Sequence, residues 1–464
     1  MSRKILLIIS IFLFYVTNCF SYQKLPKELH KILKKFPSIN EFLLNSTFDT
    51  EIRLNKQLAL YRFIDNSSKD SLYVAWSRTQ AKQKIEGISG FFWVFDTAQI
   101  DSKTPIDAAN IQAPDSPIIL FPAASHSPII DSVFVEGLPI EPIPTDGDLW
   151  FSTWAGDDNV YSGWGDGKGP LIDKEPVPWV DCGVVRLTGD FPYISAKTMY
   201  RGDLTPPLEK NDKPSSFIYF DSCLYGQFHS PLGDARIGYL SRSSDFGATW
   251  KRIGYFDERK KCSDNASPWT KANNSPFRCM FFINMGKEYN LNNDEYVYAL
   301  GIGKEWHWMS LGVYLTRVKK DSFTKYEAYE YFRGLDEMAQ PIWSKKQEEA
   351  SPLKGLITMG QGSAIYHPGI NRFLFMTDKD LFDAPNPWGP WTYAGSWTSW
   401  MNQPGRKEWQ GGYQPGIISK DISPNSFWFT VSGQNKKPYI TYTFNLGKMI
   451  MVWKCQPKII NDTK

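Results

Sequence analysis

The chain has 464 residues, of which 15% are aromatic and 22% are charged, and its formal net charge is +3. Because this charge is small and no basic tract occurs, we expect no nucleic-acid partner. No segment beyond the N-terminus reaches about 18 consecutive apolar residues, so we also expect no membrane span.

The N-terminus has the pattern of a secretory signal peptide over residues 1–21. Two basic residues precede an apolar run over residues 5–16, which is short for a membrane span. Cys19 and Ser21 then place small residues at the −3 and −1 positions before Tyr22. We therefore expect secretion to an extracellular or periplasmic compartment. A lipoprotein anchored through Cys19 is the alternative.

Residues 22–140 are expected to form an N-terminal extension that packs on the following domain or completes it. Within it, residues 24–45 carry Leu25, Leu29 and Leu33 near helical spacing among lysines, which predicts a short amphipathic helix. Short apolar runs between turn residues then predict strands, at Leu72–Trp76, Phe91–Phe95, Pro117–Phe121 and Ser132–Glu136.

Residues 141–455 repeat a pair of strands, and residues 456–464 form a tail. The first strands of the five pairs are Asn159–Trp164, Phe217–Asp221, Tyr296–Gly301, Arg372–Met376 and Phe427–Val431. The second strands are Gly183–Leu187, Arg236–Leu240, Leu311–Leu315, Trp388–Tyr393 and Tyr439–Thr443. With weaker runs between them, these pairs amount to about twenty strands, the number in a propeller of five four-stranded blades. The predicted fold class is therefore all-β, a five-bladed β-propeller. An array of β-sandwiches would explain the number of strands but not the paired spacing.

One turn has a specific pattern. Ser243, Asp245, Gly247, Thr249 and Trp250 match S-x-D-x-G-x-T-W, the Asp-box of sialidase-type propellers. The aspartate carboxylate is suited to accept backbone N–H groups, and the glycine can adopt a positive φ. We expect these residues to be structural rather than catalytic.

Several segments together resemble one family, the secreted propellers classed as domain of unknown function 4185. These segments are Gly147–Asp158, Gly163–Gly167, the Asp-box strand, Tyr314–Arg317, Tyr329–Phe332 and Pro387–Trp391. The resemblance extends over about residues 140–445. It implies a five-bladed fold, similar in plan to glycoside hydrolases, and a carbohydrate-related role. It implies no mechanism, because the family has no assigned reaction.

The cysteines predict disulfides, since an exported chain meets an oxidising compartment. Cys262 and Cys279 are one candidate pair, and Cys182 and Cys223 are a second. Cys455 leaves an odd number, so one thiol is free or pairs elsewhere. No C-x-x-C spacing occurs, so we expect no zinc site.

The first candidate site lies between Asp146 and Asp166, where five aspartates alternate with three tryptophans. Asp148 or Asp158 is a candidate catalytic carboxylate, and Trp154 and Trp164 are candidate sugar-stacking residues. The alternative is that the aspartates cap turns and the tryptophans belong to the core. Calcium binding by these oxygens is a further alternative, although the spacing is not that of an EF-hand. We otherwise expect no cofactor and no metal.

Two further places combine polar and aromatic groups. Glu305, Trp306 and His307 follow a predicted strand, and Glu305 is the candidate general acid. An aromatic loop packed on a neighbouring blade is the alternative there. Gln361, Tyr413 and Gln414 lie in glycine-rich turns that precede strands, and they are candidates for hydrogen bonding to sugar hydroxyls.

Glycoside hydrolysis uses one carboxyl group as acid and a second as nucleophile or base. We therefore expect a secreted glycoside hydrolase-like enzyme that acts on a glycan or polysaccharide. Asp148 or Asp158 would be the base or nucleophile, and Glu305 the acid. A non-catalytic glycan-binding propeller and a surface module for protein interaction are the alternatives. The sequence carries no signal for a particular sugar or oligomeric state.

Overall fold

The computed structural model describes the strands between residues 46 and 122 and most of residues 126–454. Within the second range it leaves out residues 173–176, 203–211, 231–236, 255–266, 271–272, 303–311, 355, 357, 359, 378–379, 398–412 and 434–441. The predicted signal peptide and the predicted helix over residues 24–45 lie outside the described residues. Within the described part of the chain, no helix has the length and apolar character needed to span a bilayer.

The chain divides into two compact units, residues 1–125 and residues 126–464. This boundary precedes the predicted one, at residues 140/141, because a strand before residue 140 belongs to the second unit. Both units are built from strands, and the fold is all-β as predicted. The described helical turns are four short 3₁₀ segments: η4 (Lys287–Tyr289), η5 (Lys320–Ser322), η6 (Tyr326–Ala328) and η7 (Gln347–Glu349).

The first unit contains one sheet with the strand order β1-β2-β3-β7-β5-β4-β6. Its strands are β1 (Ser46–Ile52), β2 (Leu60–Asp65), β3 (Ser71–Trp76), β4 (Ala81–Glu86), β5 (Phe91–Phe95), β6 (Ile106–Asp107) and β7 (Pro117–Pro122). The apolar runs predicted at Leu72–Trp76, Phe91–Phe95 and Pro117–Phe121 coincide with β3, β5 and β7.

The second unit begins with two antiparallel sheets. The first contains β9 (Thr145–Asp148), β10 (Ser152–Trp154), β11 (Val160–Pro170), β12 (Val180–Asp190) and β13 (Tyr193–Arg201). Both β9 and β10 pair with β11, and β10 to β13 follow in order. The second sheet contains β14 (Lys213–Phe220), β15 (Cys223–Ser230), β16 (Ile237–Ser243) and β17 (Lys251–Arg252).

The next nine strands form one continuous sheet made of two antiparallel meanders. The first meander is β18 (Cys279–Asn284), β19 (Tyr296–Ile302), β20 (Tyr314–Lys319), β21 (Glu330–Leu335) and β22 (Pro341–Ser344). The second is β23 (Ser363–His367), β24 (Arg372–Met376), β25 (Asp380–Ala384) and β26 (Thr392–Ser396). A short parallel pairing joins β18 to β23, with Ile283 opposite Ala364 and Asn284 opposite Ile365.

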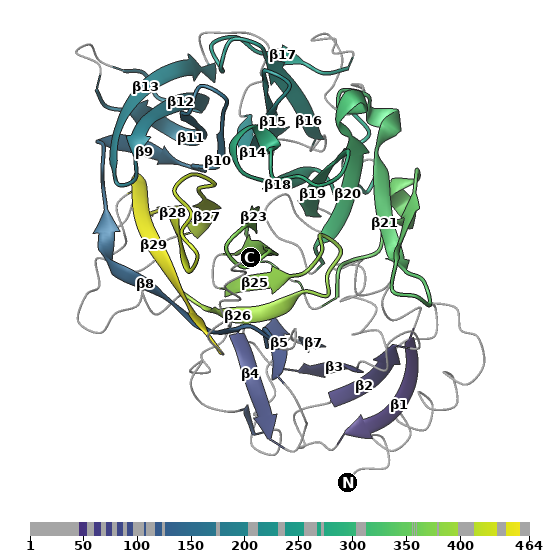
Figure 1. The fold of residues 1–464 in the computed structure, drawn as a ribbon. Helices are drawn as coiled ribbons and strands as arrows, with labels where there is room; N and C mark the ends of the chain where they lie inside the picture. Colours follow the sequence, from purple (N-terminus) through teal and green to yellow (C-terminus); the bar gives the residue numbers. More distant parts are fainter. Residues whose placement is uncertain are drawn as a thin grey trace, which may run out of the picture. The chain divides into compact units, whose positions relative to one another are not determined.

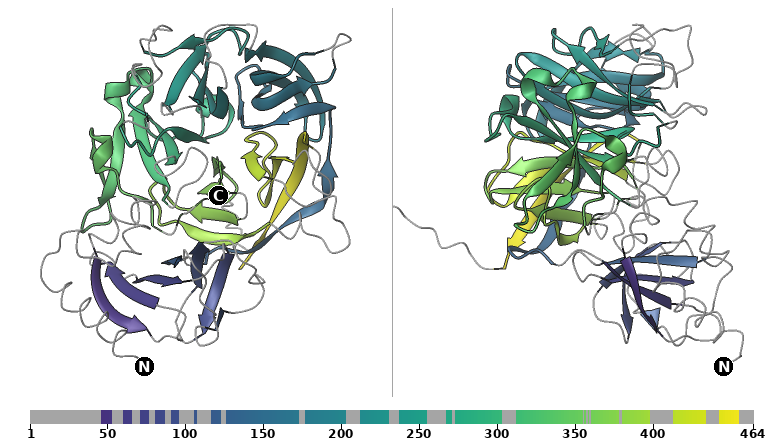
Figure 2. Two further views of the ribbon diagram at one scale, coloured as in Figure 1. Left: turned by 180° about the vertical axis from the view of Figure 1, so that it is seen from behind. Right: turned by 90° about the vertical axis from the view of Figure 1, so that its right-hand side faces the viewer.

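The last sheet joins the two ends of the second unit. It has the order β27-β28-β29-β8, with β27 (Tyr413–Ile417), β28 (Ser426–Ser432), β29 (Phe444–Trp453) and β8 (Ile130–Ile140). Because β8 pairs antiparallel with β29, the N-terminal strand of this unit closes the sheet that the C-terminal strands begin. Figures 1 and 2 show the sheets of this unit arranged around a common centre, as in a propeller.

The inner strands of these sheets run in the same direction. The strands β18 and β23 are parallel. Ser216 of β14 contacts Phe282 of β18, and Phe217 contacts Asn284. The residue numbers rise together on both strands, so β14 and β18 also run in the same direction. The start of β27 meets the end of β9, where Tyr413 contacts Asp148. We call this side of the unit, where β14, β18, β23 and β27 begin and β9 ends, the Asp148 end.

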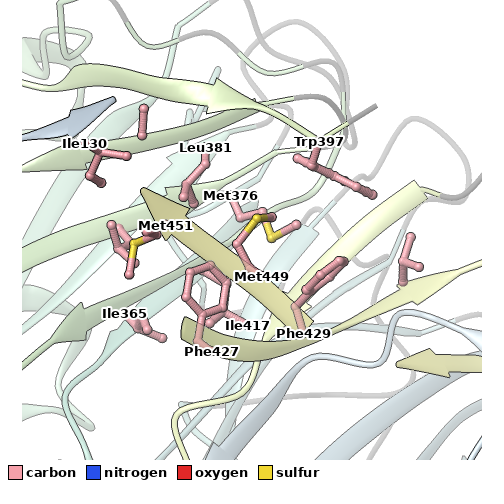
Figure 3. Packing of buried hydrophobic residues seen from close by; sticks show 13 residues of the cluster. Ile130, Ile365, Met376, Leu381, Trp397, Ile417, Phe427, Phe429, Met449 and Met451 are labelled. Carbon is pink, nitrogen blue, oxygen red and sulfur yellow. The ribbon is translucent and has the colours of Figure 1, made fainter. Parts of the chain in front are cut away.

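Apolar side chains fill the space between neighbouring sheets. Figure 3 shows one such cluster, between the β23–β26 meander and the β27–β29 strands. Phe427, Phe429, Met449 and Trp397 are among its fully buried members. Burial of apolar surface from two sheets at once is what holds adjacent sheets together, at about 25 cal/mol per Å².

The turn after β16 has the hydrogen bonds expected of its sequence pattern. The carboxylate of Asp245 accepts a 2.9 Å bond from the backbone N–H of Thr249 and a 2.6 Å bond from its hydroxyl. Ser243 Oγ lies 2.7 Å from the same carboxylate and accepts a 2.7 Å bond from Gly247 N–H. Gly247 has a φ of 86°, and the indole of Trp250 donates to its carbonyl oxygen. These contacts close the turn between Ser243 and Trp250.

The predicted pairing of Cys182 with Cys223 is wrong, because both are buried free thiols in the structure. The two side chains lie in different surroundings. Cys182 packs in an apolar cluster, whereas Cys223 Sγ accepts contacts of 3.0 and 2.8 Å from the guanidinium of Arg242. Cys279 is also a free buried thiol, and its predicted partner, Cys262, lies outside the described residues.

Candidate functional site

A glycine on β11 leaves room for the carboxyl group at the end of β9. Asp148 lies opposite Gly165 in the register of the two strands. A Cβ atom added at Gly165 would lie 2.8 Å from Asp148 Oδ1 and 3.4 Å from Lys213 Cδ. Gly147, with a φ of 128°, lets the backbone turn just before Asp148. The glycine-rich sequence therefore makes room for Asp148 and Lys213 beside the strand.

Asp148 is an almost fully buried carboxyl group, with 7% of its surface exposed. Its Oδ2 accepts a 2.6 Å hydrogen bond from the phenol of Tyr413, at the start of β27. Its Oδ1 has no hydrogen-bond partner among the described residues. Burial raises the pKa of Asp148 to about 7, and the Tyr413 bond and the Lys213 charge oppose that rise only in part. A carboxyl group of this kind can donate a proton near neutral pH.

Two tyrosines accompany this carboxyl group. Burial, together with the Asp148 charge, raises the pKa of Tyr413 and of Tyr442 well above the usual range for a phenol. The carbonyl of Tyr442 accepts a bond from Gly147 N–H, which fixes the backbone of Tyr442 beside β9. Both phenols therefore stay protonated and act as hydrogen-bond donors, not as nucleophiles.

Lys213, the first residue of β14, joins Asp148 to two further aspartates. Its Nζ donates a 2.6 Å bond to Asp166 Oδ1 and a 3.1 Å bond to the carbonyl of Asp181, whose carboxylate lies at 3.6 Å. The Lys213 side chain is buried, whereas the Asp166 side chain is 39% exposed. The ammonium also lies 5.8 Å from the ring centroid of Trp179, an indole that is 50% exposed.

Two glutamines predicted to bind substrate lie at the starts of inner strands. Gln361 precedes β23 and is 2% exposed, and its Oε1 has no hydrogen-bond partner within the described ranges. Gln414 follows Tyr413 in β27 with a φ of 53°. A bond from Ile417 N–H, at the end of β27, to Ser363 Oγ joins β27 to the first residue of β23. Both glutamines thus belong to strands that begin at the Asp148 end.

Asp158 lies in a different place. It occupies the turn between β10 and β11 with a φ of 67°. Its carboxylate accepts bonds of 3.1 Å from both Lys287 Nζ and the indole of Trp154, and Lys420 Nζ lies 3.4 Å away. The Lys287 bond is the main cause that holds the pKa of Asp158 below its usual range. Asp158 is therefore an ionised, exposed carboxylate in a cationic turn.

The structure separates Asp148 from Asp158. Trp154 pairs with Val160 at one end of β11, and Asp148 pairs with Gly165 further along it. Five residue steps along a strand correspond to about 17 Å. The aspartates and tryptophans between residues 146 and 166 therefore form two separate groups. Trp154 lies in the group that contains Asp158.

The prediction that Trp164 stacks on a sugar is wrong, because its side chain is fully buried. It stacks on Trp150 with ring centroids 6.3 Å apart. A Cβ atom at Gly183 would lie 2.1 Å from its ring, so the indole fills the space that this glycine leaves. The alternative interpretation, in which this tryptophan belongs to the core, is correct.

Glu305, Trp306 and His307 lie outside the described residues. The last described residue before them, Ile302, pairs with Cys279 at the start of β18. Among the described residues, no three His, Cys, Asp or Glu side chains gather closely enough to hold a metal ion.

Sequence reasoning missed Lys213, Tyr442 and Trp179. Lys213 and Trp179 each stand at or just before the start of a strand, and the sequence alone shows no partner for either. Tyr442 was placed in a predicted strand, although β29 begins two residues later, at Phe444. Only the position of each residue at the start of a strand could have drawn attention to it.

Comparison with known proteins gives one family match and several distant structural likenesses. Residues 225–445 match the profile of a family described as a domain of unknown function, DUF4185. The predicted resemblance to that family is confirmed over these residues. No curated protein matches the sequence of the chain.

The solved structures that resemble the chain include three carbohydrate-active enzymes. An α-L-arabinofuranosidase from Podospora anserina is 11% identical, with 70% of this chain and 97% of that one covered and a TM-score of 0.37. The catalytic domain of an α-L-arabinofuranosidase from Coprinopsis cinerea is 11% identical, with 70% and 98% covered and a TM-score of 0.39. A glycosyl hydrolase from Bacteroides ovatus is 10% identical, with 71% and 93% covered and a TM-score of 0.37.

Proposed function

We propose that the protein is a secreted glycoside hydrolase-like enzyme whose second unit is a five-bladed propeller. The signal-peptide pattern of residues 1–21 supports secretion. The blade number rests on five antiparallel groups of strands, the two meanders of the long sheet being counted separately. In this arrangement the inner strands start around one end of a central axis, and that end carries the site.

The observation that carries the proposal is the buried carboxyl group of Asp148, whose pKa is raised to about 7. In glycoside hydrolysis a protonated carboxyl group donates its proton to the leaving glycosidic oxygen. Asp148 would hold that proton at neutral pH because burial disfavours its charged form. It would therefore act as the general acid, a different role from that of base or nucleophile expected from the sequence.

Asp166 is the proposed second carboxylate. It follows Gly165, the strand partner of Asp148, and its charge acts on Asp148 electrostatically. Its ion pair with Lys213 would fix the position of its carboxylate, which a base or a nucleophile needs. Glu305 is the alternative second carboxylate, since it lies three residues beyond Ile302, which pairs with the start of β18.

The surrounding side chains would orient these groups. Tyr413 donates a hydrogen bond to Asp148, so it would fix the rotamer of the acid and stabilise the carboxylate that remains after proton transfer. Lys213 would hold Asp166 in place. Gln361, with a buried amide oxygen that lacks a partner among the described residues, would accept a hydrogen bond from a sugar hydroxyl.

Incubation of the mature protein with a panel of polysaccharides and glycoconjugates, followed by mass spectrometry of the products, tests this function. A released sugar is expected from at least one of them. The Asp148→Asn and Asp166→Asn variants should then lose release by about 100-fold or more, the scale of general acid–base catalysis. Asp158→Asn is the matched control, and its release should equal that of the wild type.

Each pattern of loss has a distinct meaning. Loss in Glu305→Gln but not in Asp166→Asn would assign the second role to Glu305. Loss in Asp158→Asn alone would place the site at the turn between β10 and β11. Binding to one glycan without release from any would reject hydrolysis in favour of a lectin-like propeller.

A further inference from the structure

We infer that Trp179 is a stacking platform for the ring of a neutral sugar, next to Asp148. This inference rests on the proposed function and names the class of substrate. Trp179 immediately precedes β12, and half of its side-chain surface is exposed. Tryptophans are large apolar residues that proteins mostly bury, so an exposed indole beside a buried polar cluster points to a ligand.

The connection between Trp179 and Asp148 runs through Lys213. The Lys213 ammonium lies over the indole at 5.8 Å from its centroid. The Cδ atom of the same side chain lies 3.4 Å from the Cβ position of Gly165, and Asp148 Oδ1 lies 2.8 Å from that position. A single lysine side chain therefore spans from the indole to the proposed acid, so a sugar ring stacked on Trp179 would lie near Asp148.

The charges around Lys213 select a neutral sugar. Lys213 is bound to Asp166 and lies 3.6 Å from the carboxylate of Asp181. With Asp148, this makes three carboxyl groups near one ammonium. An anionic sugar would have to compete with these groups for Lys213, and it would be repelled by the ionised ones. The apolar C–H face of a neutral ring, in contrast, fits an exposed indole without any charge partner.

A structural role for Trp179 is the competing explanation. The indole could serve only to cover Lys213 and to keep Asp166 in place. In that case its removal would move the pKa values of the carboxyl groups, and the pH dependence of activity would change. A platform that touches only the substrate would change binding and leave the pH dependence as it is.

Affinity electrophoresis through gels that contain a soluble polysaccharide tests the inference. The probes are arabinoxylan, linear arabinan, mixed-linkage β-glucan and galactomannan, with polygalacturonate as the anionic probe. We expect at least one neutral probe, and not polygalacturonate, to retard the wild type and the Asp148→Asn variant. Trp179→Ala should weaken that binding by about tenfold or more, which corresponds to about 1.4 kcal/mol. Trp179→Tyr should restore most of it.

Tyr193→Ala is the matched control. Tyr193 is an exposed aromatic residue, 87% accessible, beyond the other end of the same strand, β12. Its loss should leave retardation unchanged. Thermal unfolding of each variant shows whether the fold is retained, and if Trp179→Ala unfolds, the Trp179→Tyr and Trp179→His pair replaces it in the comparison.

The outcomes separate this inference from the proposed function. Unchanged binding and release in Trp179→Ala, with release lost in Asp148→Asn, would overturn the platform and leave the enzyme. Lost binding in Trp179→Ala, with full release in Asp148→Asn, would overturn the proposed acid and leave the platform. A wild type that no neutral probe retards, a shifted pH profile in Trp179→Ala, or preferential binding of polygalacturonate would each overturn the platform.

Discussion

The phenol of Tyr413 donates a 2.6 Å hydrogen bond to Oδ2 of Asp148, although the two residues are 265 positions apart in the chain. The bond joins the end of β9 to the start of β27, strands of two different sheets. It stabilises the charged form of a carboxyl group whose burial favours the neutral form. The pKa of Asp148 is therefore a balance between burial, which raises it, and the phenols of Tyr413 and Tyr442 together with the Lys213 charge, which lower it.

Removal of that donor should raise the pKa of Asp148 further above 7. A hydrogen bond to a charged group contributes about 1.5–3 kcal/mol, so Tyr413→Phe should raise the pKa by about 1–2 units. Infrared titration of the carboxyl stretch, as the difference between wild type and Asp148→Asn, measures the shift. Tyr366→Phe, on β23, is the control and should leave the pKa unchanged. A fall in the pKa would contradict the role assigned to Tyr413.

Asp148 should make the stability of the protein depend on pH. Its pKa is about 7 in the folded protein, against about 3.9 in an unfolded chain. The folded state then binds the proton more tightly, so folding loses stability as the pH rises from about 4 to about 7. The full loss is on the order of 4 kcal/mol.

The Asp148→Asn variant should lack this loss. It should be more stable than the wild type at pH 8, and the difference should shrink toward pH 4. Urea unfolding at several pH values measures it. A constant difference between the two proteins across that range would show that Asp148 titrates normally.

Gly165 should tolerate no side chain. A Cβ atom there would lie 2.8 Å from Asp148 Oδ1 and 2.9 Å from Leu149 Cδ1. Gly165→Ala should therefore cost about 1–3 kcal/mol of stability, the usual cost of overpacking. The cost should be smaller in an Asp148→Ala background, because one of the two clashes is removed. Additive costs in this double-mutant cycle would show that the glycine does not make room for Asp148.

Asp245 should contribute to stability but not to catalysis. Asp245→Ala removes the acceptor of both bonds from Thr249, and we expect a loss of about 1–2 kcal/mol. Chemical denaturation gives the loss, and release of sugar at a temperature well below unfolding gives the activity. Reduced release from a fully folded variant would place Asp245 in the site.

The three described cysteines should be detected as thiols. Burial raises the pKa of Cys182 well above the usual range and that of Cys279 to about 12, so neither should react with an alkylating agent in the folded protein. After unfolding without a reductant, Cys182, Cys223 and Cys279 should all be alkylated, as read by peptide mass spectrometry. A peptide that joins Cys182 to Cys223 would overturn the structure at this point.

The strands and the tight turn could be predicted because they depend on neighbouring residues. The short apolar runs place β3, β5 and β7 correctly, and the Asp245 turn closes through bonds that span at most four residues. The fourth strand pair was less accurate at Trp388–Tyr393, because β26 begins only at Thr392, after a turn closed by a bond from Gly389 N–H to the carbonyl of Asn386. Local patterns identify a strand better than its ends.

The residue patterns alone were enough to predict an all-β chain, the positions of many of its strands, and Asp148 as one of several candidate carboxylates. Only the tertiary structure decided which candidates share a site. Asp148 and Asp158 are ten positions apart, yet Asp158 lies in the turn at one end of β11 and Asp148 lies opposite the middle of that strand. Asp148 and Tyr413, far apart in the chain, touch. The physical reason is that burial and proximity, which set the pKa of Asp148 and hide Trp164, arise when separate sheets pack against one another.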